Sequence, residues 1–317
     1  MISAERQPAA SNDSTWSWMR CFEAEDGEFR ALQPIWDLRL GHDDVVASPL
    51  FPIVTSLIFY VLCVLPFMVI DMYGKEWRWI QKYKIQTDRE VTWSQISRAA
   101  SLTAWNHLLY ILPVTLAQWI WTPPTPLPSL APALWEFCWQ QYLALVIFDF
   151  EYYVWHMVHH RVRFLYRHVH SIHHHYSSPS SWVTEYLHPW ELISIGVFTT
   201  TSPWVFDSHP MTQWSFLLFS ILISVDDHCG YDLPLLPHHW APFWGGSIHH
   251  DMHHQKPLTN FQPFFTMWDK LFGSFCPGQR AGGLKPKSLV DWEKIPRERE
   301  TEFGMADSPK LKDHKLQ

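Results

Sequence analysis

The sequence predicts an all-α integral membrane protein with four transmembrane helices and a cytosolic, histidine-rich helical cap that holds a dimetal site. Three observations lead to this prediction. Long apolar runs carry almost no charged side chains. Only 17% of the residues are charged and 16% are aromatic, whereas about 25% of a soluble domain is charged. All but three of the 20 histidines gather between His156 and His254.

The composition argues against several function classes. A net charge of -7 does not favour nucleic acid binding. The five cysteines are odd in number and form no Cys-x-x-Cys pair. We therefore expect neither a disulfide framework nor a thiolate metal site.

The first apolar run covers residues 50–70 and carries no charged side chain. At about 1.5 Å per residue it is long enough to cross the hydrocarbon core. Residues 71–100 then carry six Lys and Arg side chains, which the positive-inside rule places in the cytosol. Residues 1–48 are therefore expected to be a lumenal N-terminal segment. The sequon that begins at Asn12 is then within reach of glycosylation, which predicts a glycoprotein.

Three more apolar stretches complete the predicted membrane-embedded domain, residues 49–277. The second span is expected at about 101–121 and the third at about 130–154, with a proline-rich lumenal turn between them. A helical hairpin over 190–225 is expected to enter and leave on the cytosolic side. Residues 278–317 are predicted to be a polar, loosely ordered C-terminal tail.

The phrase His-x-x-His-His occurs three times, at 156–160, 170–174 and 250–254. On a helix, positions i, i+3 and i+4 share one face, so each phrase is expected to direct its imidazoles to one spot. Many converging neutral imidazoles are typical of a transition-metal site. We expect this site at the cytosolic membrane face, beside the helix that leaves the third span.

Ten histidines are candidate metal ligands. Eight come from the phrases, and two more follow a predicted turn and the end of the hairpin: His156, His160, His170, His173, His174, His188, His228, His250, His253 and His254. His159 lies off the line that joins His156 and His160, so we expect it to be a ligand-supporting or exposed residue. His238, His239 and His249 are near the phrases without an assigned role, and His209 falls at a predicted lumenal turn.

The number of ligands indicates two metal ions, because a structural zinc takes four ligands and a catalytic zinc usually three. Imidazole binds iron, zinc and copper alike, so the ligand type does not identify the metal. Carboxylates near the phrases are candidates to hold imidazole tautomers by hydrogen bonds: Asp149, Glu151, Asp226, Asp227 and Asp251.

These motifs resemble those of the fatty acid hydroxylase/sterol desaturase superfamily of membrane non-haem di-iron oxygenases. Its His-x3-His motif matches His156 and His160, and its two His-x2-His-His motifs match 170–174 and 250–254. His188 and His228 match further histidines of many members. Likeness outside the motifs, for example at 112–116, 209–212 and 263–270, is greatest to the branch that hydroxylates cholesterol at carbon 25.

The resemblance implies an endoplasmic-reticulum, multi-pass membrane enzyme that hydroxylates a sterol with two iron ions, O2 and electrons from NAD(P)H. It also implies a membrane electron donor such as cytochrome b5 or a reductase. The absence of a glycine-rich nucleotide-binding motif in this sequence agrees with a separate reductase. No side chain beyond the metal ligands is expected to act in catalysis.

Several alternatives stay open. Residues 164–171 and 226–231 also resemble sphingoid base hydroxylases, and a sterol 4-methyl oxidase or a desaturase shares the same motifs. A histidine-rich metal transporter is a more remote alternative. A transporter should carry histidines along a path inside its spans, and these spans hold almost none.

Overall fold

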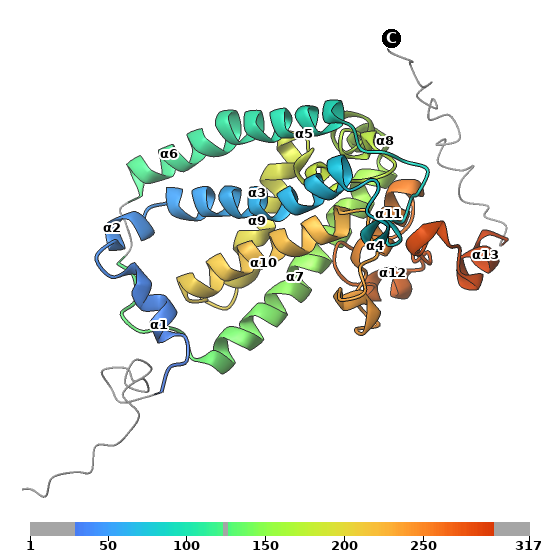
Figure 1. The fold of residues 1–317 in the computed structure, drawn as a ribbon. Coiled ribbons are helices and arrows are strands. Elements are labelled where there is room, and N and C mark those ends of the chain that lie inside the picture. Colours follow the sequence, from blue (N-terminus) through green and yellow to red (C-terminus); the bar gives the residue numbers. More distant parts are fainter. Residues whose placement is uncertain (1–28, 123–125, 295–317) are drawn as a thin grey trace, which may run out of the picture.

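The computed structural model describes residues 29–122 and 126–294, and over these ranges it is helical, with isolated bridges but no named strand. The all-α prediction is thereby confirmed for this part of the chain. Asn12 lies outside it. Long helices run side by side, while short helices gather near one end around the histidine phrases (Figure 1). The short helices at this end, which form the cap, are α4 (Arg78–Gln81), α8 (Arg163–Leu165), α11 (Gly246–Gln255), α12 (Met267–Phe272) and α13 (Lys287–Glu293). Two further short helices, α1 (Gln33–Trp36) and α2 (Asp43–Val46), lie at the opposite end of the long helices (Figure 1).

Helix α3 (Leu50–Tyr73) corresponds to the first predicted span. It follows Pro49, contains Pro66 and ends at Gly74, where a β-carbon would lie 2.6 Å from the carbonyl oxygen of Ile70. In the described residues, α3 is the one helix that is both long and apolar enough to cross a membrane. The four-span arrangement therefore remains a prediction.

The second predicted span is helical but interrupted. Helix α5 (Trp93–Asn106) begins with a capping box, in which Thr92 and Gln95 satisfy each other's backbone N–H groups. A π-helical turn over His107–Ile111 then leads into α6 (Leu112–Trp121). Pro113 lacks an N–H and its ring would clash with the preceding turn of a regular α-helix. The wider π turn accommodates this proline.

The remaining long helices are α7 (Leu134–Arg161), α9 (Pro189–Trp204) and α10 (Pro210–His228). Helix α7 begins four residues later than predicted because Ala133, which follows a proline-rich stretch, is extended. Proline at the first position fixes the start of both α9 and α10. The last two helices form the hairpin expected over 190–225.

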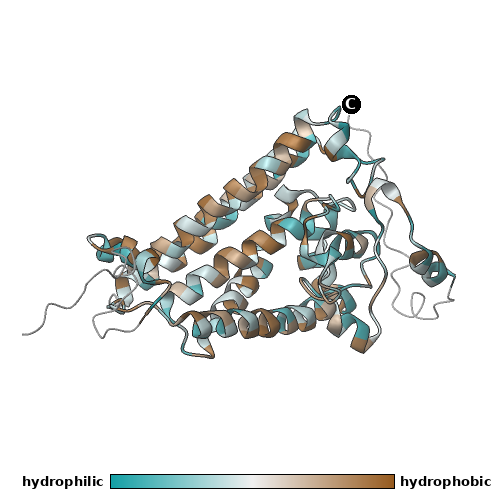
Figure 2. Ribbon diagram, turned by 60° about the horizontal axis from the view of Figure 1, so that its bottom comes forward, coloured by the Kyte–Doolittle hydropathy of each residue, from teal (hydrophilic) through white to brown (hydrophobic). Residues whose placement is uncertain are grey.

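The main apolar core joins α7, α10 and the loop before α12. Phe148 stacks on Phe264 and meets Phe216 edge-on. On the outside of the helices, apolar side chains remain exposed, as at Ile58 and Leu62 of α3. Figure 2 shows that brown, apolar positions recur along the long helices while teal gathers on the cap and near α1 and α2. Such exposed apolar faces are what helices surrounded by lipid present.

The start of the C-terminal tail is ordered, contrary to the expectation of loose order. Helix α13 buries Leu289 against Met252 of α11 and Cys276. The backbone N–H of Ala281 also donates to Asp232. Residues 278–294 therefore belong to the packed cap. Leu289 is an apolar side chain in a polar segment, and its contact with Met252 could not be predicted from local composition.

Candidate metal centre

The three histidine phrases reach the centre from different backbone structures. The first lies at the end of α7 and the third on α11, as a helix-based prediction requires. The second lies on a π turn over Tyr166–His170 followed by a 3-10 turn over His173–His175, so the expectation of a regular α-helix is wrong there. These irregular turns still bring His170, His173 and His174 into the interior.

The phrases form two groups of convergent imidazoles. Within each group the ligand atoms lie within 4.8 Å of one another. The five-histidine group consists of His156, His160, His170, His174 and His253. The four-histidine group consists of His173, His228, His250 and His254. The structure thus brings together nine of the ten candidate ligands in an arrangement that can bind two metal ions.

The second and third phrases each contribute to both groups, which corrects the expectation that one phrase serves one spot. The histidines four residues apart stay together, as His170 and His174 do in the five-histidine group. The middle histidine crosses over, so that His173 joins the other group. The third phrase mirrors this division, with His253 as the residue that crosses. On α11, which carries the third phrase, a spacing of four residues is nearer to one helical turn than a spacing of three. His250 and His254 therefore point to one group and His253 to the other.

Backbone carbonyl groups orient several of the rings. The Nδ1–H of His156 donates to Phe261 O at 2.7 Å, and that of His253 donates to Thr259 O at 2.6 Å. His228 and His254 donate in the same way to Ser224 O and Tyr176 O. Since Nδ1 carries the proton in each case, Nε2 keeps its lone pair for a metal.

Glu191 orients a fifth ring, and the sequence analysis missed it. Its Oε1 accepts from Nδ1 of His170 at 2.9 Å, and both side chains are fully buried. Glu191 lies in the first turn of α9, three residues after His188. A carboxylate in an otherwise apolar helix was the available signal, because a buried charge requires a partner.

The Nε2 contacts test whether a metal fits. Nε2 of His156 lies 2.8 Å from Nε2 of His170, although the Nδ1–H groups of both rings are engaged elsewhere. Two nitrogen lone pairs would then face each other with no proton between them, which is repulsive. A cation placed among them converts the repulsion into coordination. The donor set therefore fits a transition metal.

Burial keeps the imidazoles of the centre uncharged. Loss of solvation, followed by repulsion from neighbouring imidazoles, lowers the pKa of four of them well below the usual histidine value: His173, His174, His250 and His254. Burial lowers the pKa of His253 to about 3. Neutral imidazole is the form that binds a metal.

His188 lies outside both groups, so the prediction that it is a ligand is not supported by its position. Its Nδ1 accepts from the backbone N–H of Trp190 at 3.1 Å, which caps α9. His209 caps α10 in the same way through Met211 N. In both cases the following proline opens a helix whose first N–H groups need acceptors. His159 is buried rather than exposed and stacks on Trp155 with ring centroids 3.5 Å apart.

The carboxylates that the sequence suggested as imidazole partners have other contacts. Asp149 accepts from the backbone N–H groups of Phe264 and Phe265, and Asp251 accepts from Gln86. Glu151 instead accepts from Ser202. Neither Asp226 nor Asp227 hydrogen-bonds to His228, whose Nδ1 is occupied by Ser224 O. Proximity along the chain did not reveal these partners, because helix geometry points adjacent side chains in different directions.

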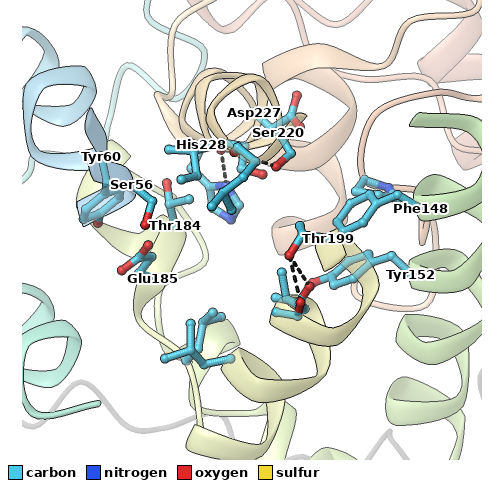
Figure 3. Close-up of a pocket in the computed structure, with 18 of the residues that line it drawn as sticks. Ser56, Tyr60, Phe148, Tyr152, Thr184, Glu185, Thr199, Ser220, Asp227 and His228 are labelled. Atoms are coloured by element: carbon cyan, nitrogen blue, oxygen red, sulfur yellow. Dashed lines mark hydrogen bonds between the residues drawn. The ribbon is translucent and has the colours of Figure 1, made fainter. Parts of the chain in front are cut away.

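A cavity of about 210 Å³ opens onto the four-histidine group. It is enclosed by parts of α3, α7, α9 and α10, and His173, His228 and His250 form one side of it. Figure 3 shows Phe148 and Tyr152 on one wall, with Ser56, Tyr60, Thr184 and Glu185 on the opposite wall. A mainly apolar molecule could therefore reach the metal centre from among the helices.

Comparison with known proteins identifies the family. Residues 141–274 match the fatty acid hydroxylase family. This range includes all three histidine phrases and Glu191. The chain is 48% identical over 246 residues to cholesterol 25-hydroxylase-like protein 2 of Danio rerio, covering 77% of this chain and 88% of that protein.

The chain belongs to the fatty acid hydroxylase family. It is also 38% identical over 245 residues to cholesterol 25-hydroxylase of Homo sapiens, with coverage of 77% of this chain and 90% of the human protein. A cholesterol 25-hydroxylase-like protein of Caenorhabditis elegans is 42% identical over 77% of this chain and 82% of its own length. No solved structure matches the chain. Membership in the fatty acid hydroxylase family makes this protein a membrane hydroxylating oxidoreductase.

Proposed function

We propose that this fatty acid hydroxylase family member is an O2-dependent di-iron monooxygenase that converts cholesterol to 25-hydroxycholesterol. The observation that carries the proposal is an apolar cavity that ends directly at His173, His228 and His250. The names of the relatives indicate the sterol and its carbon. The reaction consumes O2, two electrons and two protons, places one oxygen atom in a C–H bond and releases the other as water.

Iron fits the donor set and the family, although imidazole alone does not select it. When bound, a pair of iron ions would supply the activation of O2 and the oxidation of a C–H bond. The five-histidine group and the four-histidine group would each hold one ion. Glu191 and the carbonyl groups of the cap hold the rings in place, so the metal sites would be organised before metal binds.

The protein's own contribution is position and the exclusion of water. Phe148, Tyr152 and Leu192 line the cavity and give a sterol an apolar surface. The flexible tail of the sterol would point toward the four-histidine group. Because rate depends on holding the reacting atoms within about 3–3.5 Å, placement of the tail would select the carbon.

Electrons would come from NAD(P)H through a separate membrane partner such as cytochrome b5 or a reductase. The protein would reside in the endoplasmic-reticulum membrane as a multi-pass protein, with its N-terminus lumenal and the cap cytosolic. The basic loop that contains Lys75 and Arg78 supports this orientation, and a cytosolic cap would be accessible to the electron donor.

Purified protein, iron and a reducing system should convert cholesterol to 25-hydroxycholesterol, detected by mass spectrometry. Sphinganine and a 4-methyl sterol should be supplied in parallel reactions. A hydroxylated sphingoid base or an oxidised 4-methyl group in place of the sterol product would overturn the substrate assignment while leaving the hydroxylase class intact. A protein without product from any lipid would overturn the proposed activity.

One observation favours a sphingoid base as the second candidate substrate. Glu185 lines the cavity, and its buried Oε2 has no hydrogen-bond partner. Burial raises the pKa of Glu185, with the nearby His107 opposing the shift. A carboxyl group in this position matches the hydroxyl or amino group of a sphingoid base better than the hydrocarbon tail of a sterol. Glu185→Leu should reduce turnover of sphinganine and spare that of cholesterol if the base is the substrate.

A further inference from the structure

A third cluster of metal-binding side chains lies outside the dimetal centre, on the loop between α10 and α11. The Oδ1 atom of Asp232 lies 2.8 Å from Nε2 of His238 and 2.8 Å from Nε2 of His239. The ligand atoms of all three residues lie within 4.8 Å of one another. Neither histidine belongs to the phrases that build the dimetal centre.

The three side chains are held in place by the surrounding backbone. The other oxygen of Asp232, Oδ2, accepts from the N–H of Ala281 at 3.1 Å. Asp232 N–H donates to Tyr83 O at 2.8 Å. Asp232 is 4% exposed, so its orientation is fixed by packing as well as by these bonds. A carboxylate whose second oxygen is hydrogen-bonded is typical of a metal ligand with an organised surrounding shell.

The side of the cluster away from Asp232 is open. His238 and His239 both line a cavity of about 430 Å³, and the side chain of His239 is 31% exposed. A second acidic side chain, Asp226, interacts electrostatically with both His238 and Asp232. Two imidazoles, one carboxylate and one open position are the ligand set of a zinc ion that completes its coordination with water.

We propose that Asp232, His238 and His239 bind a zinc ion that is separate from the dimetal centre. Zinc would replace the two Nε2–H protons, which leave to solvent, and bind each Nε2 and Oδ1 at about 2.0–2.2 Å. Ligand atoms around such an ion are roughly 3.3 Å apart, so each 2.8 Å contact opens by only about half an ångström. The proposal does not depend on the hydroxylase activity.

Zinc at this site would connect three segments of the cap. It joins the segment after α4, the loop before α11 and the start of the C-terminal segment, where Gly282 N also donates to Lys84 O. The His238 ring lies directly against Gly246, the first residue of α11. A β-carbon at position 246 would lie 2.3 Å from Nδ1 of His238. Zinc would therefore brace the start of the helix that carries the third histidine phrase.

Metal counting tests the proposal directly. Full-length protein in detergent, with an affinity tag that contains no histidine, is loaded with zinc and freed of excess by gel filtration. Metal per chain is then measured by mass spectrometry. Wild type should retain one zinc more per chain than His239→Ala, and the dimetal centre should remain filled in both. His168→Ala is the matched control, because His168 is another exposed histidine.

Hydrogen exchange supplies a second measurement, which compares each protein with and without zinc and so separates a loss of zinc binding from a failure to fold. Added zinc should slow exchange at residues 279–284 in wild type and in His168→Ala, and should not change it in His239→Ala. Asp232→Asn, which keeps an oxygen for Ala281 N–H, should behave like His239→Ala. Equal zinc content in wild type and His239→Ala would overturn the proposal, as would a loss of the same size in His168→Ala.

Discussion

At the residue scale, Glu191 holds the orientation of the His170 ring. Its carboxylate is completely buried and accepts from Nδ1 of that ring, which leaves Nε2 facing the other imidazoles. Carbonyl oxygens perform the same task for His156 and His253. A carboxylate differs from a carbonyl because its charge also increases the basicity of the ring that it contacts.

Replacing Glu191 by Gln should weaken metal binding about 10- to 100-fold, since partners of metal-bound histidines have effects of this size. Metal affinity can be measured by competition with a chelator of known affinity. Glu151→Gln is the matched control, because Glu151 is a partly buried carboxylate that accepts from Ser202 and touches no candidate ligand. Unchanged affinity in Glu191→Gln would show that the carbonyl-held rings suffice.

His173→Ala should reduce hydroxylation to the assay background, because the side chain belongs to the four-histidine group and lines the cavity. His253→Ala should do the same through the five-histidine group. His168→Ala should stay within about twofold of wild type, as expected for an exposed position. Product formation is measured by mass spectrometry on protein shown to be folded. Full activity in His173→Ala would mean that the centre has been misplaced.

At the element scale, the loop between α11 and α12 positions ligands on α7 and α11. Its carbonyl groups at Thr259 and Phe261 orient His253 and His156. Asp269 of α12 holds the loop by accepting from Phe261 N and Gln262 N, both at 2.9 Å. The same carboxylate accepts from Ser274, so one buried residue connects the loop with the end of α12.

Asp269→Ala should therefore destabilise the protein and loosen the metal centre together. Each buried N–H group left without an acceptor costs about 1–3 kcal/mol. We expect a lower unfolding temperature and a reduced metal content after loading, measured by thermal unfolding and mass spectrometry. Asp291→Ala, at an exposed carboxylate that pairs with Lys294, should change neither. Normal metal content in a destabilised Asp269→Ala protein would show that the loop is not needed to position the metal ligands.

At the scale of the whole molecule, the candidate metal centre lies where the long helices meet the cap (Figure 1). The cavity reaches it from between α3, α7, α9 and α10. Exposed apolar side chains on those helices fit a lipid environment, and polar groups concentrate on the cap (Figure 2). This division agrees with the proposed function, in which an apolar substrate would come from the bilayer and electrons would arrive at the membrane surface.

The orientation can be tested by protease protection in sealed microsomes. A tag placed before residue 1 should be protected, and a tag after residue 317 should be digested, because the basic loop over 71–100 is expected in the cytosol. Detergent should expose both tags and serves as the control. A digested N-terminal tag in sealed vesicles would overturn the predicted topology.

Much of the architecture was accessible from local patterns. Apolar runs predicted the positions of α3, α7 and the hairpin within a few residues, since helix length and the choice of apolar residues are local properties. The repeated phrase predicted which histidines converge. Pro113 carried a signal for the π turn, but the wider turn itself depends on how the helix relieves the clash.

The sequence by itself determined that this protein is helical and that its histidines meet, because spacing along a helix decides which side chains share a face. Only the tertiary structure decided how the phrases divide into two groups, because His173 and His253 cross over to partners more than fifty residues away along the chain. It likewise assigned Glu191 to His170 and turned His188 into a helix cap. These contacts depend on helix packing, in which a rotation of one residue sends a side chain to a different neighbour.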